Sequence, residues 1–121
     1  MPTILVVDDD ISVRAMTRLF LTRKGYAVLE AINGLEAESI AEAESPDLIL
    51  LDIMMPDQDG FITCANLRTK GYTRPIMLIT ALHFMRGETQ AEECGANGYL
   101  RKPVTGTLLL NVVAEALKGS G

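Results

Sequence analysis

The stretch DLILLDIMMP, residues 47–56, decides how this chain folds. Its four consecutive Leu and Ile residues, 48–51, show no alternation of polar and apolar side chains. Such a run is typical of a central parallel strand that helices cover on both faces. Asp52 follows the run, and burying its charge without a partner would be costly. We therefore expect Asp52 at the open carboxyl edge of a sheet, where ligands bind in doubly wound α/β folds.

Length and composition fit one globular domain over residues 1–121, with a core over about residues 3–117. The chain has 121 residues, of which 48% are hydrophobic, so it is not a disordered chain. Its apolar runs are strand-sized and residues 1–3 leave no room for a signal peptide, so we expect a cytoplasmic protein without a membrane span. The net charge of −5 disfavours direct nucleic-acid binding and suits acids that a cation neutralises.

Apolar segments of strand length alternate with longer helical segments along the chain. The predicted strands cover residues 3–7, 26–30, 48–52, 75–79 and 99–101. The predicted helices follow the strands and end at about residues 25, 44, 69, 94 and 118, the fourth beginning near Phe84. Five such pairs joined by short loops favour a doubly wound parallel sheet with right-handed crossovers.

Short polar motifs predict where the helices begin. The candidate caps are Asp9 or Asp10, Asn33 with Glu36 in a capping box, Asp59, and Thr105 or Thr107. On the first helix we expect a buried stripe made of Ile11, Ala15, Met16 and Leu19, with the arginines on other faces. Cys64 and Cys94 lie in predicted helices; buried free thiols are the favoured interpretation, and a disulfide or shared metal is the alternative.

Polar residues follow four of the predicted strands at their carboxyl ends. Asp8 and Asp9 follow the first strand, Asp52 ends the third, and Thr80 and Lys102 follow the fourth and fifth. In the strand order 2-1-3-4-5, the first and third strands are neighbours. The three carboxylates are therefore expected in one pocket.

A gathered set of carboxylates requires a cation. Two like charges about 4 Å apart repel by roughly 4 kcal/mol at an effective dielectric near 20. Oxygen ligands without a nearby His or thiol favour Mg²⁺ over Zn²⁺. One Asp can then attack a phosphoryl group, with the lysine ammonium and a threonine hydroxyl on the transferred oxygens.

In combination, these motifs resemble the CheY-like receiver domain of two-component response regulators. The matching pieces are Val6-Val7-Asp8-Asp9, residues 51–56 with Asp59-Gly60, Thr80-Ala81, and residues 98–103. The resemblance covers residues 3–117 without a large gap. It implies a flavodoxin-like (βα)5 fold with the strand order 2-1-3-4-5.

The resemblance implies a Mg²⁺ site, with Mn²⁺ as an alternative ion. Asp9 and Asp52 would bind the metal directly, Asp8 mostly through water, and Met54 through its backbone carbonyl. Asp52 would also be the phosphoacceptor. Thr80 and Lys102 would hold the phosphoryl oxygens.

Further roles are implied around the site. Tyr99 would be the aromatic switch residue that turns inward when Thr80 moves, and the Lys102–Pro103 peptide bond would be cis. Ala81 would keep space open. Met54 and Leu82 are apolar at the two variable flanking positions, so we expect slow self-dephosphorylation.

The resemblance also implies partners. A histidine kinase or phosphotransfer protein would donate the phosphoryl group, and the surface of residues 84–94, 99–101 and 105–118 would change shape for a downstream effector, a missing C-terminal output domain or a second copy. The chain would be no enzyme beyond its own phosphorylation and dephosphorylation.

Two alternatives remain open at this stage. A receiver-shaped interaction module would have lost phosphorylation, but the acids, Thr80 and Lys102 are all present. A Mg²⁺-dependent phosphatase with an Asp nucleophile would need a second Asp where Met54 stands. His83 is expected to be solvated or packed, and Val104, where the family often has Phe, should alter packing alone.

Overall fold

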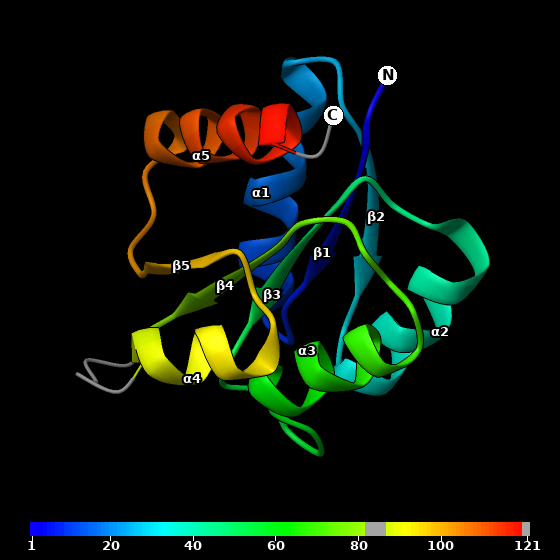
Figure 1. The fold of residues 1–121 in the computed structure, drawn as a ribbon. Helices are drawn as coiled ribbons and strands as arrows, with labels where there is room; N and C mark the ends of the chain where they lie inside the picture. The colour runs from blue at the N-terminus through cyan, green and yellow to red at the C-terminus, as the bar shows by residue number, and fades with distance from the viewer. Residues whose placement is uncertain (82–86, 120–121) are drawn as a thin grey trace.

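Five parallel strands form one sheet in the order β2-β1-β3-β4-β5, in a computed structural model that describes residues 1–81 and 87–119 (Figure 1). The strands are β1 (Thr3–Val7), β2 (Ala27–Ala31), β3 (Leu48–Asp52), β4 (Ile76–Thr80) and β5 (Gly98–Arg101). The helices are α1 (Ile11–Arg23), α2 (Gly34–Glu44), α3 (Gly60–Thr69), α4 (Gly87–Cys94) and α5 (Gly106–Gly119). The predicted strand order and fold class are confirmed.

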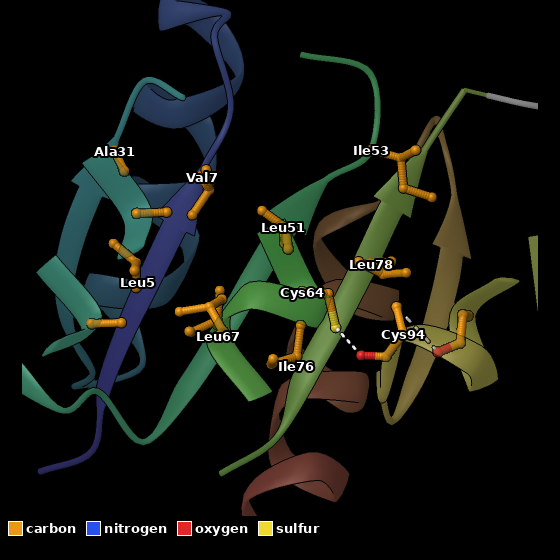
Figure 2. Packing of buried hydrophobic residues seen from close by; sticks show 14 residues of the cluster. Leu5, Val7, Ala31, Leu51, Ile53, Cys64, Leu67, Ile76, Leu78 and Cys94 are labelled. Carbon is orange, nitrogen blue, oxygen red and sulfur yellow. Dashed lines mark hydrogen bonds between the residues drawn. The ribbon is translucent and has the colours of Figure 1, made fainter. Parts of the chain in front are cut away.

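The sheet has a buried core on each face. Alternate side chains of β1 and β3 point to opposite faces, and helices cover both faces, so residues 4–7 and 48–51 are all apolar. Helices α1 and α5 cover one face, where the cluster contains Ile4, Val6, Leu48, Leu50, Leu21, Leu109 and Val113 (Figure 1). Helices α2, α3 and α4 cover the other, where Leu5, Val7, Ile49 and Leu51 pack (Figure 2).

The helix starts follow the predicted caps. Asp10 Oδ1 accepts the Ser12 amide at 2.8 Å, which settles the choice between Asp9 and Asp10. Asn33 and Asp59 cap α2 and α3 in the same way. Thr105 Oγ1 accepts the Leu108 amide at 3.2 Å, so Thr105, not Thr107, caps α5. These caps satisfy backbone amides that a helix leaves unpaired.

The predicted buried stripe of α1 is wrong. Ile11 is 72% exposed, Met16 61% and Leu19 47%, and Ala15 is also exposed. The helix instead turns Leu21 into the core, with Phe20 packed against it. The orientation of the helix is also fixed by Arg14 and Arg18, which pair with Glu30 on β2.

The two cysteines are free and buried, as the favoured interpretation predicted. The Cys64 thiol donates to the carbonyl oxygen of Cys94 at 3.4 Å, which ties α3 to the end of α4 (Figure 2). Burial, followed by the neighbouring Cys94, raises the pKa of the Cys64 thiol well above its ordinary value. A thiol held in this protonated form is a poor nucleophile.

Some predictions fall on residues outside the described ranges. They are the start of the fourth helix near Phe84, the flanking position Leu82, and His83. Within the ranges that the structure describes, no helix combines the length and apolar character needed to cross a membrane.

Candidate functional site

Strand register brings the polar residues to one edge of the sheet. Val7 pairs with Leu51, so Asp8, which follows β1, and Asp52, the last residue of β3, lie at the same level. On the other side, the Lys102 amide donates to the Thr80 carbonyl oxygen at 2.6 Å. The carboxyl ends of four strands therefore meet around one site.

Three carboxylates gather there, as the sequence predicted. One oxygen from each of Asp8, Asp9 and Asp52 lies within 4.8 Å of the others. Asp8 and Asp52 are each 4% exposed, whereas Asp9 is exposed. Oxygen ligands with one side open to water fit a hard divalent ion that keeps part of its hydration shell.

Lys102 lies between the two buried acids. Its Nζ is 3.1 Å from Asp8 Oδ2 and 3.5 Å from Asp52 Oδ2. Burial alone would lower the pKa of Lys102, but the hydrogen bond to Asp8 and the charge of Asp52 together raise it. The ammonium is thus charged at neutral pH. One positive charge beside three carboxylates leaves the site negative, and a divalent ion would correct this.

The burial of the site and the crowding of acids together raise the pKa of Asp52. Burial and then the charge of Asp8 raise its pKa to about 6, against the opposing effects of Lys102 and of the Met54 amide. That amide donates to Asp52 Oδ1 at 3.2 Å. The ionised form is therefore unfavourable when no cation is bound.

Removing this charge should stabilise the metal-free protein. Asp52→Asn is expected to raise the free energy of unfolding at pH 7 by about 3 kcal/mol. Folding raises the pKa of Asp52 from 3.8 to about 6, so the ionised side chain of the wild type destabilises the folded state at this pH. A raised carboxyl pKa means that stability falls as the pH rises from about 4 to above 6. The gain should therefore vanish below pH 4.

Urea unfolding in EDTA at pH 7 and pH 4 measures this difference. A loss of stability in Asp52→Asn at pH 7 would show that the charge of Asp52 is already compensated in the metal-free protein.

The structure also places the remaining predicted residues. Thr80 is 2% exposed at the end of β4, and Met54, 55% exposed, follows Asp52 by two residues. The Lys102–Pro103 peptide bond is cis. Tyr99 lies two positions before Arg101 on β5, is half-buried, and packs against the cluster between the sheet and helices α2 to α4. It is thus set back from the edge where the acids meet.

Sequence reasoning missed Arg14 as a supporting residue. It was expected on a face away from the core, yet its side chain is 11% exposed. Its Nη1 donates to the Asp8 carbonyl oxygen at 2.7 Å, and its Nε lies 3.1 Å from Glu30 Oε1. Arg18, followed by Arg14, lowers the pKa of Glu30. The available signal was Glu30, an acid near the end of the strand beside β1.

Three carboxylates and a lysine thus lie together at the carboxyl edge of a doubly wound α/β sheet, the edge where such domains bind their ligands. Residues 4–114 match the family model of the response regulator receiver domain. The chain belongs to this family.

Two curated relatives are transcriptional regulators. The chain is 38% identical over 105 residues to the DNA-binding dual master transcriptional regulator RpaA of Synechocystis, matching 85% of this chain and 44% of that protein. It is 42% identical over 100 residues to the alkaline phosphatase synthesis transcriptional regulatory protein PhoP of Bacillus subtilis, matching 83% of this chain and 42% of that protein. The chain thus spans less than half the length of these relatives.

Solved structures match along almost their whole length. The chemotaxis protein CheY4 of Vibrio cholerae has a TM-score of 0.92 at 32% identity, with 96% of this chain and 98% of that chain covered. A putative response regulator from Chloroflexus aurantiacus has a TM-score of 0.90 at 34% identity, with 97% and 98% covered.

Proposed function

We propose that Asp52 accepts a phosphoryl group, in a reaction that depends on Mg²⁺, from a histidine kinase or a phosphotransfer protein. The observation that carries the proposal is the set of three carboxylates within 4.8 Å of one another, with Lys102 Nζ between two of them. A carboxylate oxygen of Asp52 attacks the phosphorus, the bond to the donor breaks, and the donor leaves with that bonding pair.

In this proposal, the carboxylates at the sheet edge bind the metal. Asp9, Asp52 and the Met54 carbonyl would hold Mg²⁺, with Asp8 binding through water and Mn²⁺ as an alternative ion. The ion would neutralise charge on the transferred oxygens.

The chain's own groups supply the rest of the chemistry. Asp52 is largely ionised at pH 7 despite its raised pKa, so it can act as the nucleophile. Its Oδ1 accepts the Met54 amide, which orients the carboxylate. The Lys102 ammonium moves from the acids to a phosphoryl oxygen, and the Thr80 hydroxyl donates to another.

Phosphorylation would then act as a switch. The added dianion draws Thr80 and Lys102 toward Asp52, and Tyr99 turns inward. The surface formed by α4, β5 and α5 changes shape for an effector, an output domain or a second copy. Such a change is a shift of population between two packed states.

Exposed apolar side chains flank the site and suit a donor protein. Ile11 follows the Asp10 cap by one residue and is 72% exposed, and Met16 on the same helix is 61% exposed. Apolar groups that stay in water beside a reactive site favour contact with a partner. They give the phosphodonor a surface to bind while its phosphoryl group reaches Asp52.

The phosphorylated form is expected to be long-lived. Met54 is exposed at the site and carries no group that could orient a water molecule for attack on the phosphorus. Met54 also argues against the phosphatase alternative, because that chemistry needs a second Asp at its position.

The direct test is incubation with acetyl phosphate and Mg²⁺, followed by intact-mass spectrometry. The wild type should gain the mass of one phosphoryl group and lose it slowly after the donor is removed. Asp52→Asn, or wild type in EDTA, should gain none. An unmodified wild type would favour the interaction module that no longer takes phosphate, and repeated turnover of a phosphomonoester would favour the phosphatase.

A further inference from the structure

The loop that follows β3, residues 53–59, is tied to helix α2 by a polar side chain. Gln58 Nε2 donates to Glu38 Oε2 at 2.6 Å and to Thr63 Oγ1 at 2.9 Å. Thr63 Oγ1 in turn donates to the Asp59 carbonyl oxygen at 2.9 Å. Gln58 therefore joins the end of this loop to both α2 and α3.

Glu38 is buried and held by several partners, so it gives Gln58 a rigid site of attachment. The residue is 6% exposed, and a buried charge is tolerated only when it is fully partnered. Besides Gln58, it accepts Asn66 Nδ2 at 3.2 Å and lies 2.9 Å from Lys70 Nζ. Burial opposes these contacts, but together they lower the pKa of Glu38, so it stays ionised at neutral pH.

Close packing leaves the Gln58 side chain little freedom. A Cβ at Gly34, the first residue of α2, would lie 2.1 Å from Thr63 Oγ1 and 2.8 Å from Gln58 Nε2. The absence of a side chain at Gly34 is what lets α2 approach the loop so closely. The amide of Gln58 is thus enclosed between α2 and α3.

The same short loop carries a proposed metal ligand. It starts directly after Asp52 and contains the Met54 carbonyl. It is closed by a hydrogen bond from the Gly60 amide to the Ile53 carbonyl oxygen at 2.9 Å, and it holds Asp57 in the left-handed region at φ 71°. Gln58 is four residues from Met54 within this short, closed loop.

We infer that Gln58 is a positioning residue: by binding the buried carboxylate of Glu38, it fixes the loop that presents the Met54 carbonyl, and so it sets the affinity of the site for a divalent cation. This inference rests on the proposed function. Residues that orient a metal ligand from outside its coordination shell often control affinity strongly.

The test compares two variants that each remove one hydrogen bond to the same carboxylate. Gln58→Ala removes the bond from the loop, and Asn66→Ala removes the bond from α3. Mg²⁺ binding is measured by calorimetry well below the unfolding temperature, and stability by urea unfolding in EDTA. We expect Gln58→Ala to weaken Mg²⁺ binding by about tenfold. Asn66→Ala should lose similar stability and bind Mg²⁺ as the wild type does.

Equal Mg²⁺ affinity in Gln58→Ala and the wild type would overturn the inference and leave the proposed function intact. A wild type that binds no Mg²⁺ would instead overturn the proposed function and the inference with it. If Gln58→Ala does not fold, the exchange Glu38→Gln with Gln58→Glu restores the bond with donor and acceptor reversed. It should bind Mg²⁺ more tightly than Gln58→Glu alone, and equal binding by the two would count against the inference.

Discussion

Replacing Gly60 with alanine is expected to destabilise the protein by about 3 kcal/mol, the upper end of the range for overpacking. A Cβ at this position would lie 2.5 Å from the Asp52 carbonyl oxygen and 2.7 Å from Ile53 Cα. Both are backbone atoms, so relief requires moving the strand end that carries Asp52, the proposed phosphoacceptor. Urea unfolding measures the loss.

Gly106→Ala is the matched control, because Gly60 and Gly106 are the first residues of their helices. A Cβ at Gly106 would lie 2.7 Å from the ring of Phe20, a side chain that can rotate away. Alanine also favours a helix over glycine by about 1 kcal/mol. The control should therefore lose far less stability. Equal losses in the two variants would contradict the idea that the backbone beside Asp52 is fixed.

Replacing Lys102 with methionine should slow phosphorylation from acetyl phosphate by about 10²- to 10³-fold, the cost of removing one group that stabilises developing charge. Methionine keeps most of the apolar stem, so the effect reports on the ammonium. The change also removes a charge that opposes the rise in the pKa of Asp52, already at about 6. The pH midpoint of the reaction should therefore move upward.

The initial rate of phosphoryl incorporation, followed between pH 5 and 9, checks both effects. Lys118→Met is the control, because Lys118 is an exposed lysine on α5 paired with Glu115 at 3.7 Å. It should react as the wild type does. An unchanged rate in Lys102→Met would remove the lysine from the proposed chemistry.

The features that the sequence predicted well are those set by local rules. An unbroken Leu and Ile run can be buried on both faces only in a central strand, so β3 and its neighbours followed from residues 48–51. Parallel strands end at one edge, which placed Asp8, Asp52 and Lys102 together. Asn33 caps α2 because its side-chain oxygen accepts a backbone amide of the first turn.

The features that the sequence did not predict depend on contacts between distant elements. The face that α1 turns to the sheet depends in part on Arg14 meeting Glu30, which is 16 residues away. The contact between Gln58 and Glu38 joins a loop to helix α2 over 20 residues of sequence. Periodicity within a single element carries no information about either pair.

In the proposed function, three carboxylates can share one edge of the sheet because a divalent cation neutralises them. Calorimetric titration of the metal-free protein with Mg²⁺ at pH 7 tests it most directly. Asp10 provides the control, because its carboxylate caps α1, a role that asparagine fills equally well. We predict one Mg²⁺ per chain in the wild type and in Asp10→Asn, and binding at least about tenfold weaker in Asp9→Asn and Asp52→Asn. Absence of binding, or equal binding in all four proteins, would contradict the account.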